Sequence, residues 1–194
     1  MQAGKLIFIF ATCLLGQFAC SSLRGQTLYR QTQNSYIAVS GTSTLHDWTM
    51  TSKEPKCQVY LEQQSSGEPT VISSFSLSVK SESLKSGHSA MDKNAYSTLN
   101  TSQHKNIVFE LTNARLNAGK AEGAGQLTVA GLTKPITLEV NYKALPNGTV
   151  LLWGSKKLQM SDFGIEPPTF MFGTVQTGDP ITVSFNFELT AAKK

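Results

Sequence analysis

His46 and Asp47 stand side by side and are of the residue types that perform acid–base catalysis. Neighbouring residues on a strand point to opposite faces of a sheet, so these two cannot form a catalytic dyad with each other. His88 and His104 lack the short paired spacing of zinc ligands. The chain also contains no Gly-x-Ser-x-Gly nucleophile elbow. The sequence therefore predicts a protein that is not an enzyme and has neither a metal site nor a resident cofactor.

Cys57 is a further candidate nucleophile. It alternates with Val59 and Leu61, which is the spacing of residues that face the core from one strand. We interpret it as a small buried apolar residue. At most Cys20 would remain beside it after removal of a leader, so no disulfide framework is expected within the domain, and the core must hold the fold by itself.

The beginning of the chain has the pattern of a signal peptide. Lys5 precedes an apolar run over residues 6–15, which is too short to span a bilayer and is followed by small and polar residues. No later segment is apolar over a membrane-spanning length. We expect a signal peptide over residues 1–26, one domain over 27–194 that is periplasmic or otherwise exported, and no transmembrane span.

Two kinds of processing fit this leader. Cleavage before Cys20 and acylation of its thiol would fit a lipoprotein signal, although Gln17 stands where such signals usually carry Leu. Ordinary cleavage near Gly25 fits equally well. A lipid anchor on Cys20 would change the attachment of the protein and leave its fold unchanged.

The charge of the chain excludes one class of partner. The formal net charge is +4, and loss of Lys5 and Arg24 with the leader would lower it to +2. Such a weak surplus without a basic cluster does not indicate nucleic-acid binding. No group of Arg and Lys residues suited to a pyrophosphate stands out either, so we expect a ligand to be selected by chain length and shape rather than by its head group.

Apolar and polar residues alternate in a large part of the chain. The period of two recurs in eight segments, near 35–46, 56–63, 70–81, 105–113, 126–129, 136–142, from 150 onward and 181–189. Each segment is apolar on one face and polar on the other, which is typical of antiparallel sheet. Eight such strands can form a sandwich or a closed barrel, and the alternation by itself does not separate the two.

One helix is expected within this series of strands. Ser89 with Asp92 three residues later has the form of a capping box, and Met91, Ala95 and Leu99 share one face at helical spacing. We predict a helix over about 89–99, between the third and fourth strands.

Three motifs resemble those of the YceI-like lipid- and polyisoprenoid-binding family. They are Gly-Thr-Ser-Thr-Leu-His-Asp-Trp at 41–48, Gly-Gln-Leu-Thr-Val-Ala-Gly-Leu-Thr-Lys-Pro-Ile at 125–136, and Ser-Asp-Phe-Gly-Ile-Glu-Pro-Pro at 161–168. The segment 86–94 also resembles the family's helical region, and together these pieces cover nearly all of 35–190. The resemblance implies an extended lipocalin-like antiparallel barrel that encloses an isoprenoid or other lipid chain, commonly in the periplasm.

We therefore predict an all-β fold, an eight-stranded antiparallel lipocalin-like β-barrel with one short helix, that holds a polyisoprenoid, quinone-like or fatty-acyl lipid. Among the inward side chains, the phenylalanines at 75, 109, 185 and 187 are expected to line a tunnel. The predicted ligand-binding residues are Ile37, Val39, Phe75, Leu77, Val79, Ile107, Phe109, Leu111, Leu127, Val129, Ile136, Leu138, Val140, Phe185 and Phe187.

Three questions stay open from the sequence. The alternative function is that of a structural or interaction module of the cell envelope whose barrel is filled by its own side chains. The apolar loop over 161–180 either plugs one barrel end or forms a portal for the ligand, and we favour plugging because such loops usually bury their own aromatic residues. The oligomeric state is undetermined, with a homodimer as one option.

Overall fold

The structure is a computed structural model that describes residues 26–64 and 68–192. The predicted signal peptide lies outside the described residues, apart from Gln26. The strands are β1 (Gln26–Gln31), β2 (Tyr36–Ser43), β3 (Trp48–Ser52), β4 (Lys56–Gln63), β5 (Pro69–Lys80), β6 (Asn106–Leu111), β7 (Ala114–Asn117), β8 (Lys120–Val129), β9 (Leu132–Ala144), β10 (Val150–Gln159), β11 (Thr169–Phe170) and β12 (Val175–Ala191). The helices are η1 (Ser81–Ser83), α1 (Ser89–Thr98) and η2 (Ser161–Phe163).

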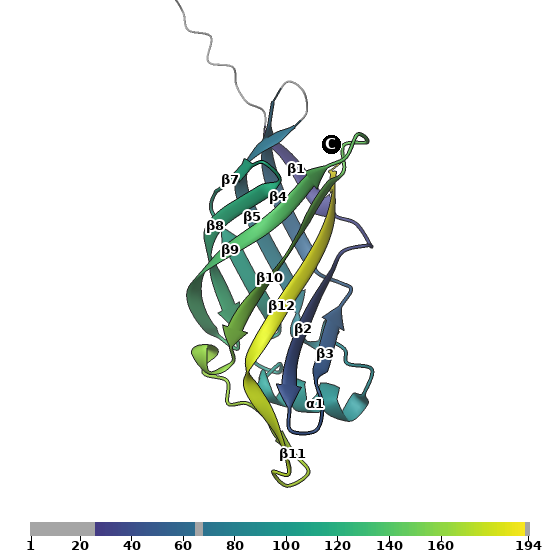
Figure 1. Ribbon diagram of the computed structural model, residues 1–194, viewed down its shortest axis with the longest axis vertical. Helices are drawn as coiled ribbons and strands as arrows, with labels where there is room; N and C mark the ends of the chain where they lie inside the picture. Colours follow the sequence, from purple (N-terminus) through teal and green to yellow (C-terminus); the bar gives the residue numbers. More distant parts are fainter. Residues whose placement is uncertain (1–25, 65–67, 193–194) are drawn as a thin grey trace, which may run out of the picture.

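Eight strands close into an antiparallel barrel, as predicted. Their order is β1-β4-β5-β6-β8-β9-β10-β12, and β12 pairs back with β1. The last strand is long enough to serve two partners, because its C-terminal part pairs with β1 and its preceding part pairs with β2. The β2–β3 hairpin thereby extends the wall of the barrel downward, as Figure 1 shows.

The placement of the helix between the third and fourth strands was wrong. Helix α1 follows the fifth strand, because residues 26–52 form β1 and the β2–β3 hairpin where the alternation indicated a single strand near 35–46. The predicted span of 89–99 agrees with Ser89–Thr98, but the capping box does not form. His88 occupies the N-cap position, and the carboxylate of Asp92 accepts hydrogen bonds from Ser86 instead.

The two ends of the barrel differ in packing. The end that carries β1 and the 145–149 turn is solid: Val59, Leu61 and Leu189 have no exposed surface, and Val150 is 2% exposed. At the opposite end α1 lies across the opening below β2 and β3 (Figure 1). The inward side chains there are half-buried rather than fully buried, as at Leu77, Ile107 and Val183, so this end has room for something besides the protein.

Candidate functional site

The inward faces of the strands enclose an apolar cavity of about 510 Å³. This volume lies within the usual range of small-molecule sites, roughly 300–1,000 Å³. Every residue predicted to bind the ligand lies on its wall. Alternation along each strand explains this placement, since residues two apart share a face and the closed barrel turns that face inward. Their contact with a ligand stays a prediction.

Four phenylalanines cross the interior from one wall to the other. The ring centroid of Phe75 on β5 lies 6.1 Å from that of Phe109 and 5.9 Å from that of Phe187, and the rings of Phe185 and Phe187 are stacked at 5.7 Å. Spacings of this size are typical of aromatic rings in contact. The four rings line the cavity, but they also touch one another in a chain, so they narrow the tunnel that the sequence predicted.

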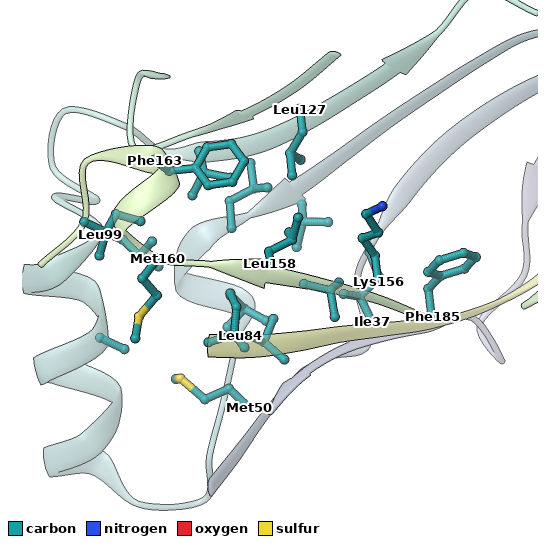
Figure 2. A pocket seen from close by; sticks show the side chains of 18 of the residues that line it. Ile37, Met50, Leu84, Leu99, Leu127, Lys156, Leu158, Met160, Phe163 and Phe185 are labelled. Atoms are coloured by element: carbon teal, nitrogen blue, oxygen red, sulfur yellow. The ribbon is translucent and has the colours of Figure 1, made fainter. Parts of the chain in front are cut away.

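Helix α1 forms part of the wall at the open end. Met91, Ala95 and Leu99, the predicted apolar stripe, all line the cavity, and so do Leu45 and Trp48 of the β2–β3 hairpin. Figure 2 shows Leu99 of the segment after α1 and Met50 of β3 on the two sides of this opening, with Met160 between them.

Polar contacts fix α1 to the segment that precedes it. The carboxylate of Asp92 accepts hydrogen bonds from the Ser86 backbone N–H (2.8 Å) and hydroxyl (2.7 Å), and Lys85 Nζ lies 4.0 Å from it. Burial opposes ionisation of this carboxyl, but the two hydrogen bonds hold its pKa below the ordinary value.

Tyr96 adds a second attachment of α1. Its hydroxyl oxygen accepts a hydrogen bond from Lys85 Nζ (2.7 Å) and lies within donating distance of the carbonyl oxygens of Glu82 (2.9 Å) and Leu84 (2.8 Å). The Lys85 ammonium also lies 5.0 Å from the centre of the Tyr96 ring. The hydrogen bond with Tyr96 raises the pKa of Lys85. Together the Tyr96 contacts hold the helix in place over the opening.

The loop after β10 divides into two parts with different roles. Phe163 and Ile165 are buried and line the cavity, which agrees with the plugging interpretation for this part. Phe170 and Phe172 lie on the projecting β11–β12 hairpin and are exposed, Phe172 completely, and Phe170 also lines the cavity. The buried part is held by Asp179, whose carboxylate accepts hydrogen bonds from the Ser161 N–H (2.8 Å) and hydroxyl (2.5 Å); these bonds lower its pKa.

Lys156 is a cavity residue that the sequence analysis missed. It lies on β10 opposite Val183, an inward residue of β12, and it is half-buried on the cavity wall. Figure 2 shows its amine rising into the cavity between Leu158 and Phe185. The alternation of Leu152, Lys156 and Leu158 could have revealed it, since these residues share one face of β10. The expectation that chain length and shape outweigh the head group rested on the lack of an Arg and Lys cluster, and it did not consider a single lysine on the cavity wall.

Among the described residues, the candidate catalytic side chains form no hydrogen bond with one another. The Nδ1 atom of His46 lies 2.7 Å from the backbone carbonyl oxygen of Asp47. The His46 side chain also lines the cavity. Cys57 is 3% exposed, and burial raises the pKa of its thiol to about 12, which makes it a poor nucleophile. Within residues 26–64 and 68–192, His, Cys, Asp and Glu side chains form no group of three that could hold a metal ion.

A scan against family models decides the relationship that the motifs suggested. The YceI-like domain model matches residues 29–189. The chain belongs to the YceI-like family. In the described part of this YceI-like chain, no helix is long and apolar enough to cross a membrane.

Solved structures of low sequence identity share the YceI-like fold. BcnA of Burkholderia cenocepacia superposes with a TM-score of 0.68 at 13% identity, covering 83% of this chain and 99% of BcnA. A polyisoprenoid-binding domain from Saccharophagus degradans, implicated in plant cell wall breakdown, gives 0.65 at 10% identity, covering 87% of this chain and all of that domain. At these identities the similarity shows the fold alone.

Curated relatives match over a shorter stretch. A UPF0312 protein of Pseudomonas aeruginosa is 30% identical over 99 residues, which is 46% of this chain and 51% of the relative. A UPF0312 protein of Serratia proteamaculans is 29% identical over 99 residues, again 46% of this chain and 50% of the relative. The chain thus spans about half the length of the curated relatives it matches.

Proposed function

We propose that this YceI-like protein is an exported binding protein that holds a long apolar molecule inside its barrel and performs no chemistry on it. The ligand class is a polyisoprenoid, a quinone-like lipid or a fatty-acyl lipid. The observation that carries the proposal is the apolar cavity of about 510 Å³ at the open end of the barrel. An apolar chain gains free energy when it leaves water for such walls, up to about 0.8 kcal/mol per methylene group.

The cavity also argues against the alternative of a filled structural module. In a barrel that only packs against itself, the inward side chains would interlock as they do at the solid end around Val59 and Leu189. At the open end Leu77, Ile107 and Val183 keep part of their surface exposed to the cavity. The polyisoprenoid-binding domain of Saccharophagus degradans, which has the same fold, supports a lipid as the occupant.

Extraction of the purified protein tests the proposal. The chain is expressed with its leader, purified without detergent and extracted with chloroform and methanol, and the extract is analysed by mass spectrometry. We expect one lipid class in near-stoichiometric amount. An extract no different from that of an unrelated exported protein, together with no uptake of added lipid by the delipidated protein, would contradict the proposal.

The export part of the proposal rests on the sequence, namely Lys5 and the apolar run that follows it. Cell fractionation tests it, and Cys20→Ser separates the two kinds of processing. If Cys20 is acylated, the substitution moves the protein from the membrane fraction to the soluble one. A soluble protein in both forms indicates ordinary cleavage.

A further inference from the structure

Lys156 is a cation on a cavity wall that is otherwise apolar at that depth. Its neighbours along the inward face of β10 are Gly154 and Leu158, and the facing residue on β12 is Val183. The other polar residues of the cavity wall come from the β2–β3 hairpin, the α1 region and the beginning of β12, and they are Ser43, His46, His88, Asn94, Thr98 and Thr177. The Lys156 amine therefore lies deeper in the barrel than the other polar groups, and its side chain lies between Leu158 and Phe185 in Figure 2.

The described residues supply no counter-ion for the Lys156 amine. Among the described residues that line the cavity there is no Asp or Glu, and the ion pair found in the described part of the chain joins Lys85 to Asp92. The Lys156 Nζ atom also makes no hydrogen bond with the described residues. An apolar ligand that filled the cavity would leave this ammonium without water and without a partner, which is costly.

We propose that the cavity selects a long-chain molecule that carries a single carboxylate and that this carboxylate pairs with Lys156. The inference rests on the proposed function, and it specifies the head group of the ligand. One carboxylate matches one ammonium in charge and in hydrogen bonding, since a carboxylate accepts and an ammonium only donates. A pyrophosphate would bring more negative charge than one lysine can neutralise among apolar walls, and a neutral alcohol would leave the lysine unpaired.

The test is a displacement experiment on delipidated protein loaded with the neutral fluorescent probe N-phenyl-1-naphthylamine. Hexadecanoate and hexadecanol, which share a chain length, compete for the probe, and geranylgeranyl pyrophosphate serves as a third competitor. We expect hexadecanoate to bind at least about tenfold more tightly than hexadecanol, as a charge-assisted hydrogen bond implies. Equal binding of the two, or tighter binding of the pyrophosphate, overturns the proposal.

Two substitutions on the same strand locate the effect. Lys156→Met keeps most of the length of the side chain and removes the charge, so the preference for hexadecanoate should disappear while hexadecanol binds at least as well as before. Lys157→Met is the matched control, since Lys157 is the exposed neighbour on the outer face of β10, and it should keep the preference. If the Lys156→Met protein also prefers hexadecanoate to hexadecanol, another group causes the preference and the proposal fails.

A third variant and the neutral competitor keep the result interpretable. Lys156→Gln retains a donor without charge and replaces Lys156→Met if that variant does not fold, with the same expected loss of preference. Failure of every competitor to displace the probe from the wild-type protein contradicts the lipid-binding function itself. Equal displacement by hexadecanol and hexadecanoate contradicts the proposed pairing of a ligand carboxylate with Lys156, but it still supports the lipid-binding function.

Discussion

The ring of Phe109 lies directly against the backbone of Gly125 on the neighbouring strand β8. A Cβ atom at position 125 would come within 2.5 Å of the Phe109 Cζ atom. The same relationship joins Gly154 to Phe185, where the distance is 2.9 Å. Both rings line the cavity. Because Gly125 and Gly154 have no side chain, the rings can pack against the barrel wall and leave the space at the centre of the cavity free.

Gly125→Ala should reduce both stability and ligand capacity. The added methyl group meets the Phe109 ring and also the Glu110 carbonyl oxygen, at 2.5 Å, and the second contact cannot be relieved by a side-chain movement. We expect a loss of about 1–3 kcal/mol in the free energy of unfolding, measured by urea titration, and weaker displacement of a bound probe by lipid. Ala124→Val adds bulk to the exposed face of the same strand and should change stability by less than about 0.5 kcal/mol. A Gly125→Ala protein as stable as wild type would contradict this account.

Alternation with period two was sufficient to predict which residues share the inward face, because it places a residue on one face whatever the tertiary context. The choice of a barrel over a sandwich came from the resemblance to the YceI-like family. The alternation was insufficient where the chain interrupts a strand. Residues 32–35 break β1 from β2, and 44–47 form the turn between β2 and β3, so the expected single strand became three. The breaks depend on the pairing of β12, whose C-terminal part pairs with β1 and whose preceding part pairs with β2. These partners are more than a hundred residues apart in the sequence, so no local sequence pattern predicts their pairing.

Helix α1 shows a similar division. Its span and its apolar face follow from local spacing, as Met91, Ala95 and Leu99 do line the cavity. The partner of Asp92 does not follow, because the Ser86 hydroxyl competes successfully with the helix N-terminus for the same carboxylate. Lys156 was missed for another reason: no residue of the alternating segment that begins at 150 was among the predicted ligand-binding residues, although Lys156 shares a face with Leu152 and Leu158.

Leu77→Trp should separate ligand binding from folding. Leu77 lies on the cavity wall and pairs across β5–β6 with Phe109, so an indole there fills space that the ligand would use. We expect the variant to fold, with a loss of about 1–3 kcal/mol, and to yield much less extracted lipid. Ser76→Trp, which places the same indole on the outer face of β5, should yield as much lipid as wild type. A folded Leu77→Trp protein that retains its lipid would exclude the cavity as the site.

Asp92→Asn should remove part of the acid sensitivity of the protein. Because the folded pKa of Asp92 is lowered, its contribution to stability is present above the unfolded pKa of about 3.9 and is lost as the pH falls through the folded value. We expect the variant to melt at a lower temperature than wild type at pH 7, and the two melting curves to converge near pH 3. Asp47→Asn, on the exposed β2–β3 hairpin, is the control and should melt as wild type does at both pH values. A constant difference between Asp92→Asn and wild type from pH 7 to 3 would contradict the role of ionised Asp92.

Cys57 should resist thiol reagents as long as the barrel is closed. Burial raises its pKa to about 12, and the thiolate is the reactive form, so at pH 8 the reaction should be slower by roughly a thousandfold than that of an ordinary cysteine of pKa near 8.5. The measurement is the rate of reaction with Ellman's reagent in a protein that carries Cys13→Ser and Cys20→Ser. Urea at unfolding concentrations should restore the ordinary rate. A fast reaction without urea would mean that Cys57 is exposed in the native barrel.

The same thiol reports on the closure of the barrel at β1. The Cys57 backbone N–H donates a hydrogen bond to the Gln31 side-chain oxygen at 2.8 Å, next to the place where β1 ends and the pairing of β12 passes to β2. Gln31→Leu removes this acceptor and leaves a part-buried N–H unpaired, which costs about 1–3 kcal/mol. We expect faster labelling of Cys57 in this variant at low urea, from local opening of β1, with a smaller change in the midpoint of global unfolding. Gln58→Leu changes an exposed residue of β4 and should leave the labelling rate unchanged. If both variants label Cys57 at the wild-type rate, the closure between β1 and β4 does not depend on Gln31, and backbone pairing alone maintains it.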